Sequence, residues 1–109
     1  MLQAWAWLIG AIVFEVLGTT AMKLSEGFIK TIPSVAMMVF YILSLTALTY
    51  ALKKFDVSMA YAIWSGVGTA LITLIGIWYF KESVSVMKIV SIGLIIIGVV
   101  GLHLSAKIH

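Results

Sequence analysis

The chain has 109 residues, of which 63% are hydrophobic and 10% are charged, a balance typical of a protein embedded in lipid rather than dissolved in water. The net charge of +3 comes with scattered lysines and no arginine, which argues against the basic patch of a nucleic-acid-binding protein. The absence of cysteine excludes a disulfide framework and a thiolate metal site.

Four apolar runs are each long enough to cross a bilayer as a helix: residues 2–22, 33–52, 58–80 and 85–106. A hydrocarbon core of about 30 Å requires roughly 20 apolar residues in helical form. The first run lacks the basic start and cleavage signature of a secretory signal, and we expect it to be retained. We predict an all-α integral membrane protein with one four-helix domain over residues 1–109.

The first run contains Glu15, the only acidic side chain within the four apolar runs. A charged residue near the bilayer centre costs roughly 2.5–3.5 kcal/mol on insertion scales, so we interpret Glu15 as functional. At 100° per residue, several small or flexible side chains lie within about 60° of it on the helix surface. These predicted pocket-lining residues are Leu8, Ala11, Gly18 and Thr19. Small residues on one stripe can also serve simply to let two helices pack closely. The carboxylate on the same stripe is the reason we favour a pocket over close packing.

The second run opens with Pro33 in its first turn, where a missing N–H costs little. Tyr41 and Ser44 follow as candidate wall residues of a binding pocket. Hydroxyls in membrane helices also commonly bond to their own backbone, and both interpretations stay open for this helix.

The third run places Tyr61, Trp64, Ser65 and Gly68 on one helical face, and we expect Ser65 and Gly68 to line the same pocket. Trp64 lies deep in the run, away from the interface where tryptophan belts form. Phenol and indole faces attract organic cations by roughly 2 kcal/mol or more when desolvated, so Glu15, Tyr61 and Trp64 form a plausible cation site. We expect Gly66 and Gly68 to act as a conformational hinge, with a close-packing seam as the alternative.

The fourth run carries a narrow stripe of small residues suited to contact with another helix: Ser91, Gly98, Gly101 and Ser105. We predict that this stripe forms a dimer interface, because four short helices do not easily enclose both a site and a gated path. His103 and His109 have no neighbours that complete a metal-coordination set, so we expect no metal.

The distribution of the lysines hardly favours either orientation of the protein in the membrane. Four spans place both termini on one side, with Lys53, Lys54 and Lys107 on that side and four lysines opposite. Because an excess of basic residues normally marks the cytoplasmic side, a difference of one predicts dual topology, with copies inserted both ways.

These features together resemble the small multidrug resistance family over essentially the whole chain. The resemblance is carried by EVLGTTAMK at residues 15–23, SEGF at residues 25–28 and AYAIWSGVG at residues 60–68. Asp56 departs from the pattern, where a proline is expected.

The family resemblance implies an antiparallel homodimer in the bacterial inner membrane. It also implies a proton-coupled antiporter in which Glu15 of both subunits binds either protons or a lipophilic cation, with Tyr61 and Trp64 lining the pocket and Tyr41 and Ser44 contributing. The family divides into exporters of quaternary ammonium and other bulky cations, and exporters of guanidinium. Gly18 and Ser65 resemble the first group, since guanidinium exporters tend to have tryptophan near position 18 and threonine at position 65.

The principal alternative within the family is a guanidinium exporter. From other classes, the alternatives are a proton-conducting oligomer, or a structural membrane subunit that acts with a paralogous partner. We find no nucleophile–base pair, metal cluster or phosphate-binding loop in the sequence, so we expect neither an enzyme nor a cofactor.

Overall fold

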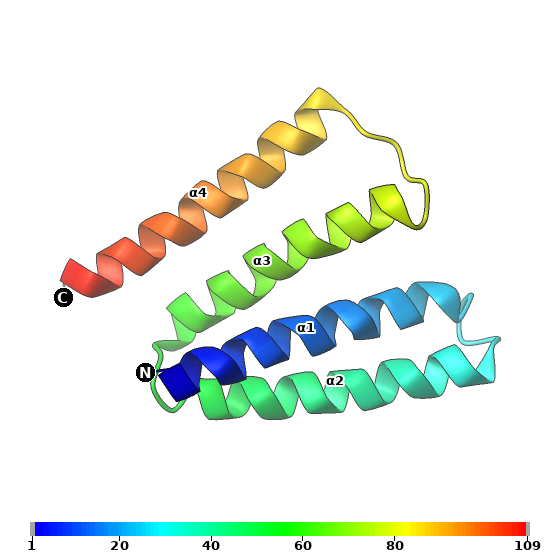
Figure 1. Ribbon diagram of the computed structural model, residues 1–109, viewed down its shortest axis with the longest axis horizontal. Helices are drawn as coiled ribbons and strands as arrows, with labels where there is room; N and C mark the ends of the chain where they lie inside the picture. The colour runs from blue at the N-terminus through cyan, green and yellow to red at the C-terminus, as the bar shows by residue number, and fades with distance from the viewer. Residues whose placement is uncertain (1, 109) are drawn as a thin grey trace. The chain divides into compact units, whose positions relative to one another are not determined.

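The computed structural model describes residues 2–108, with side chains described as far as Ser105, so Lys107 and His109 lie outside the described side chains. It contains four helices, α1 (Leu2–Leu24), α2 (Thr31–Ala51), α3 (Val57–Trp78) and α4 (Val86–Ile108) (Figure 1). At about 1.5 Å per residue, each is roughly 32–35 Å long, enough to cross the hydrocarbon core. All four are long and apolar enough to span a membrane, which confirms the predicted fold class.

The helix bounds differ from the apolar runs by a few residues at most ends. Helix α2 begins at Thr31, two residues before Pro33, and α3 ends at Trp78, two residues before Phe80. Proline therefore lies in the first turn of α2, where the helix leaves backbone N–H groups unpaired in any case. Helix α4 begins after Ser85, whose Oγ accepts a hydrogen bond from the backbone N–H of Lys88 at 3.0 Å.

Two compact units make up the chain, Met1–Phe55 with α1 and α2, and Asp56–His109 with α3 and α4. Each unit is a hairpin of two adjacent helices that run in opposite directions (Figure 1). A single domain over residues 1–109 stays a prediction.

The first hairpin is held together by small side chains and one buried hydrogen bond. Ala11 and Ala51 are fully buried and Ala47 is 4% exposed, so the two backbones approach closely. Ser44, which is 1% exposed, donates from Oγ to the carbonyl oxygen of Ala11 at 2.7 Å. The rings of Phe14 and Phe40 stack with centroids 6.3 Å apart.

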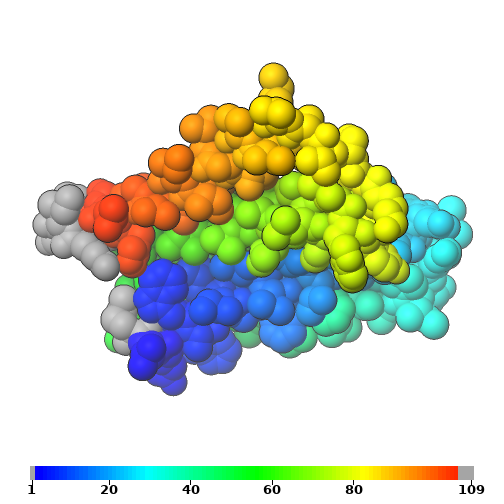
Figure 2. Space-filling model, turned by 45° about the horizontal axis from the view of Figure 1, so that its top comes forward, coloured from blue at the N-terminus to red at the C-terminus, as the bar shows by residue number. Residues whose placement is uncertain are grey.

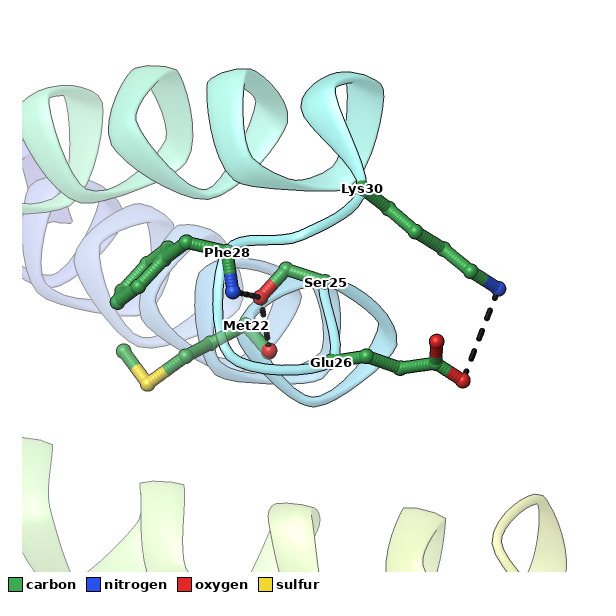
Figure 3. Close-up of polar contacts among 5 residues, drawn as sticks. All are labelled: Met22, Ser25, Glu26, Phe28 and Lys30. Carbon is green, nitrogen blue, oxygen red and sulfur yellow. Dashed lines mark hydrogen bonds and ion pairs between the residues drawn. The ribbon is translucent and has the colours of Figure 1, made fainter.

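The turn between α1 and α2 is built around the buried Ser25 (Figure 3). Its Oγ donates to the carbonyl oxygen of Met22 at 2.7 Å and accepts from the backbone N–H of Phe28 at 3.1 Å. Glu26 and Phe28 both adopt positive φ, at 50° and 69°. Side chains other than glycine pay roughly 1–2 kcal/mol for that conformation, and the hydrogen bonds of Ser25 offset part of this cost.

The second hairpin has a glycine contact at its centre. A Cβ atom on Gly66 would lie 2.6 Å from Cγ2 of Val99 and 3.2 Å from Cγ2 of Ile95, so α4 packs directly against the α3 backbone. Helix α3 continues without interruption through Gly66 and Gly68. The close-packing alternative therefore has direct support at Gly66, while a hinge at Gly66 and Gly68 stays a prediction.

Within the second hairpin, helix α4 touches α3 along one side. Figures 1 and 2 show the two helices side by side. None of the residues in the window Val86–Ser105 is buried, and a Cβ on Gly98 or Gly101 would meet no atom within 4 Å. Within this hairpin, α3 therefore leaves the small-residue stripe of α4 free of contact at Gly98 and Gly101.

Replacing Ser25 with alanine should destabilise the first hairpin. The variant leaves the Phe28 N–H without its partner and removes the side-chain hydrogen bond to the Met22 carbonyl, and the expected loss in the free energy of unfolding is about 1–3 kcal/mol. Denaturant unfolding in detergent, followed by circular dichroism, measures this loss.

Ser34→Ala is the matched control, because the Ser34 hydroxyl bonds to the Lys30 carbonyl at an exposed position. Equal stability losses in the two variants would contradict the assigned role of Ser25.

Candidate functional site

Glu15 lies near the middle of α1 and is half-buried. Thr19, one turn further along the same helix, donates from Oγ1 to Oε1 of Glu15 at 2.8 Å. Residues four apart share a helix face, so the local geometry of α1 brings the two side chains together. The carboxylate therefore has a hydrogen-bond donor inside an apolar helix.

Tyr41 of α2 extends this contact across the hairpin. Its hydroxyl oxygen lies 2.7 Å from Oγ1 of Thr19. A threonine hydroxyl has only one proton, and Thr19 uses it toward Glu15, so the Tyr41 hydroxyl is the donor to Thr19. The result is a chain of two hydrogen bonds from Tyr41 through Thr19 to Glu15.

Gly18 makes room for the Tyr41 ring. A Cβ atom at this position would lie 2.5 Å from Cδ1 and 2.6 Å from Cε1 of Tyr41. Both distances are shorter than carbon atoms tolerate without a shift, so any larger residue at position 18 must move the ring. Gly18 thus positions Tyr41, which in turn holds the Thr19 hydroxyl.

Three other predicted site residues of this hairpin are buried. Leu8 and Ala11 have no exposed surface, and Ser44 uses its hydroxyl to bond to the Ala11 carbonyl. The structure thus gives these side chains a packing contact, and a direct contact with a bound molecule stays a prediction.

Tyr61 and Trp64 form an aromatic pair on α3. Their ring centroids are 5.6 Å apart and the ring planes meet at 66°, an edge-to-face arrangement. Tyr61 is 59% exposed, whereas Trp64 is half-buried. The indole Nε1 of Trp64 is buried and has no hydrogen-bond partner within the part of the chain that the structure describes.

The polar side chains that follow Tyr61 on α3 bond to their own helix. Ser65 donates from Oγ to the Tyr61 carbonyl at 2.8 Å, and Thr69 and Thr73 repeat this pattern one and two turns later. Their hydroxyl protons are therefore satisfied without another helix. The Ser65 hydroxyl proton is directed to the backbone, and a role for Ser65 in lining the pocket stays a prediction.

The two sets of groups have complementary chemistry. The first hairpin presents a carboxylate that two hydroxyls orient, and the second presents two aromatic faces and an N–H donor. A carboxylate attracts an organic cation by charge, and aromatic faces attract one by cation–π interaction. Among residues 2–108, no group of three histidine, cysteine or acidic side chains is placed to bind a metal ion.

Sequence reasoning named Thr19 and Tyr41 but missed the hydrogen-bond chain that links them to Glu15. The four-residue spacing of Glu15 and Thr19 was a sufficient signal for the first bond. The second bond joins residues 22 positions apart on two helices, and no local pattern reports it. The dependence of Tyr41 on Gly18 was missed for the same reason.

Comparison with known proteins agrees with these features. The family model described as "Small Multidrug Resistance protein" matches residues 3–95. The chain is 59% identical over 100 residues to the membrane protein YvaE of Bacillus subtilis, covering 92% of this chain and 84% of that protein. It is 40% identical over 106 residues to the quaternary ammonium compound-resistance protein QacE of Escherichia coli, covering 97% and 96%. A guanidinium exporter of Yersinia pestis is 37% identical over 104 residues, covering 95% and 100%.

The family match extends over most of the chain and includes Glu15, Tyr61 and Trp64. It agrees with the four helices, which are long and apolar enough to span a membrane. These relatives come from bacteria, and the Yersinia pestis protein is named as an exporter. The protein is therefore a member of the small multidrug resistance family and a multi-pass protein of the bacterial inner membrane.

Proposed function

We propose that this protein is a proton-coupled antiporter that exports lipophilic and quaternary ammonium cations. The observation that carries the proposal is Glu15, a carboxylate in the middle of an apolar helix whose Oε1 accepts a hydrogen bond from Thr19 at 2.8 Å. Such a group can hold a proton or face a cation, and in hydrocarbon it needs one of the two. Protons and cargo therefore compete for the same carboxylate.

Competition at one site couples the two movements. When a cation binds, Glu15 releases its proton, and when a proton binds, the cation loses its counter-charge. If only loaded forms change their access, proton influx drives cation efflux. Each proton supplies roughly 1.4 kcal/mol per pH unit, and each net charge moved supplies about 2.3 kcal/mol per 100 mV.

The aromatic pair on α3 supports a bulky cation as cargo. Tyr61 is exposed and packs edge-to-face with Trp64, so the pair offers aromatic surface next to an unused N–H donor. Aromatic faces and apolar burial impose little directional demand, which favours a broad range of cargo.

We further propose that the working unit is an antiparallel homodimer. Two features support this, the near-balance of lysines between the two ends of the spans and the small-residue stripe of α4, which α3 leaves free of contact at Gly98 and Gly101. In such a pair the two open states are equivalent, with the roles of the subunits exchanged, and one sequence then provides alternating access.

Gly18 favours bulky cations over guanidinium as cargo. The Tyr41 ring occupies the space beside Gly18. Guanidinium exporters of the family tend to have a tryptophan near position 18, and a tryptophan at that position would clash with the Tyr41 ring. The name of the relative QacE points to the same class of cargo. Guanidinium remains the second candidate because a guanidinium exporter also matches over the whole of its length.

Addition of tetraphenylphosphonium to the purified protein in weakly buffered detergent should release protons, and Glu15→Gln should abolish this release. The amide of glutamine neither binds nor releases a proton in this range, so the exchange site is lost. A pH electrode or indicator dye measures the release directly.

Glu26→Gln is the matched control, since Glu26 lies in the α1–α2 turn and pairs with Lys30 at 3.8 Å. Full release by the Glu15 variant would overturn the competition scheme. Release with guanidinium but not with phosphonium, in the native protein, would establish the second candidate instead. Proton uptake into liposomes without any cation would indicate a proton conductor.

Gly18→Ala should weaken cation binding by moving the Tyr41 ring and breaking its bond to Thr19. The loss of one hydrogen bond corresponds to a roughly 3- to 10-fold rise in Kd. Isothermal titration with tetraphenylphosphonium measures the Kd. Gly10→Ala is the control on the same helix, because a Cβ there meets no atom within 4 Å. Equal affinities for the two variants would contradict the role of Gly18.

Trp64→Ala should reduce affinity for large aromatic cations more than for small ones. A desolvated cation–π contact of about 2 kcal/mol corresponds to roughly 30-fold in Kd for tetraphenylphosphonium, with a smaller change for tetramethylammonium. Trp78→Ala is the control, since Trp78 is 74% exposed at the end of α3. Equal losses for the two cations would argue against aromatic recognition.

A further inference from the structure

A pocket lies in the first hairpin, between the beginning of α1 and the end of α2, away from Glu15. Its volume is about 330 Å³, at the small end of the range for ligand sites in proteins. The pocket is lined by Gln3, Ala4, Trp7, Tyr50, Lys53 and Lys54. None of these residues belongs to the proposed transport site.

Two stacked rings form one wall of this pocket. The centroids of Trp7 and Tyr50 are 4.9 Å apart and their planes meet at 27°. The ammonium nitrogen of Lys53 lies 4.9 Å from the centroid of the Tyr50 ring, so the same ring also orients the lysine. The wall therefore combines an apolar surface with a positioned positive charge.

The charges in the pocket are all positive. Lys53 and Lys54 are adjacent, and no lining residue is acidic. Within the described residues, neither ammonium group has a carboxylate oxygen within 4.0 Å; the ion pair of this hairpin joins Lys30 and Glu26 at the opposite end. Two neighbouring ammonium groups without a counter-charge favour an anion and disfavour the cationic cargo of Glu15.

The depth of the pocket in the membrane identifies the anion further. Lys53 and Lys54 directly follow the apolar span Thr31–Ala51, and Trp7 and Tyr50 lie just within the spans, at the level where aromatic side chains meet lipid headgroups. Snorkelling of lysines to headgroups accounts for the two charges. It does not account for a preformed pocket with an aromatic wall and an amide side chain.

We propose that this pocket binds the phosphate group of an anionic phospholipid. Lys53 and Lys54 neutralise the phosphate charge, the Gln3 side-chain amide donates a hydrogen bond, and the Trp7 and Tyr50 rings pack against the glycerol and the upper acyl chains. The site is independent of transport chemistry, because it shares no residue with Glu15 or its hydrogen-bond partners.

Native mass spectrometry of the protein in detergent tests this proposal with phosphatidylglycerol as the probe and phosphatidylcholine as the neutral comparison. We expect preferential phosphatidylglycerol binding that falls by roughly 30-fold in the double variant Lys53→Gln/Lys54→Gln, from the loss of two interfacial lysines. The matched control, Lys23→Gln/Lys30→Gln, removes the same charge at the other end of the same hairpin and should retain native binding.

Equal losses in the two double variants would reduce the effect to general charge attraction and overturn the proposal, as would equal binding of the two lipids by the native protein. A second variant, Trp7→Leu, should weaken lipid binding without any change in charge, and unchanged binding there would remove the aromatic wall from the site. Displacement of the lipid by millimolar glycerol phosphate would identify a soluble phosphate as ligand and overturn the lipid assignment. Retained tetraphenylphosphonium binding confirms that each variant is folded.

Discussion

Hydrocarbon offers no partner for a hydrogen bond, and the polar groups of this protein are arranged under that constraint. The four helices satisfy most backbone groups internally, and the hydroxyls of Thr46, Thr49, Thr69 and Thr73 bond to carbonyls of their own helix. Ser44 departs from this pattern by bonding across to α1, and so ties the two helices of its hairpin together. Each of these groups ends with a partner and needs no ligand.

Glu15 is the group that this constraint leaves incomplete. One donor, Thr19, serves a carboxylate that has room for about four hydrogen bonds. The remaining capacity is what makes the side chain available to a proton or to a cation. In the proposed mechanism, function depends on a polar group that the fold orients but does not fully satisfy, and the buried Nε1 of Trp64 likewise has no hydrogen-bond partner among the described residues.

Much of this architecture was predictable because a membrane imposes simple rules on sequence. The lengths of the apolar runs predicted four helices, and the single carboxylate inside them is the basis of the proposed site. Contacts between helices were not predictable in the same way. Tyr41 meets Thr19 only because α1 and α2 align in one register, and Ser44 faces α1 for the same reason.

Turns were the other feature that sequence patterns could not supply. The turn after α1 places Glu26 and Phe28 in a conformation usually reserved for glycine, which residue preferences argue against. A buried serine with two hydrogen bonds overrides those preferences. These hydrogen bonds form only when the turn has folded, and no periodic pattern in the sequence predicts them.

The contact between Gly18 and the Tyr41 ring links two positions that are far apart in the chain. Because a Cβ atom and the ring cannot occupy the same space, a bulky residue at position 18 is compatible only with a displaced or smaller side chain at position 41. Evolutionary change at either position is therefore constrained by the other, and the pair should covary among relatives. A single bulky substitution at position 18 therefore displaces the tyrosine ring beside the carboxylate unless position 41 changes as well.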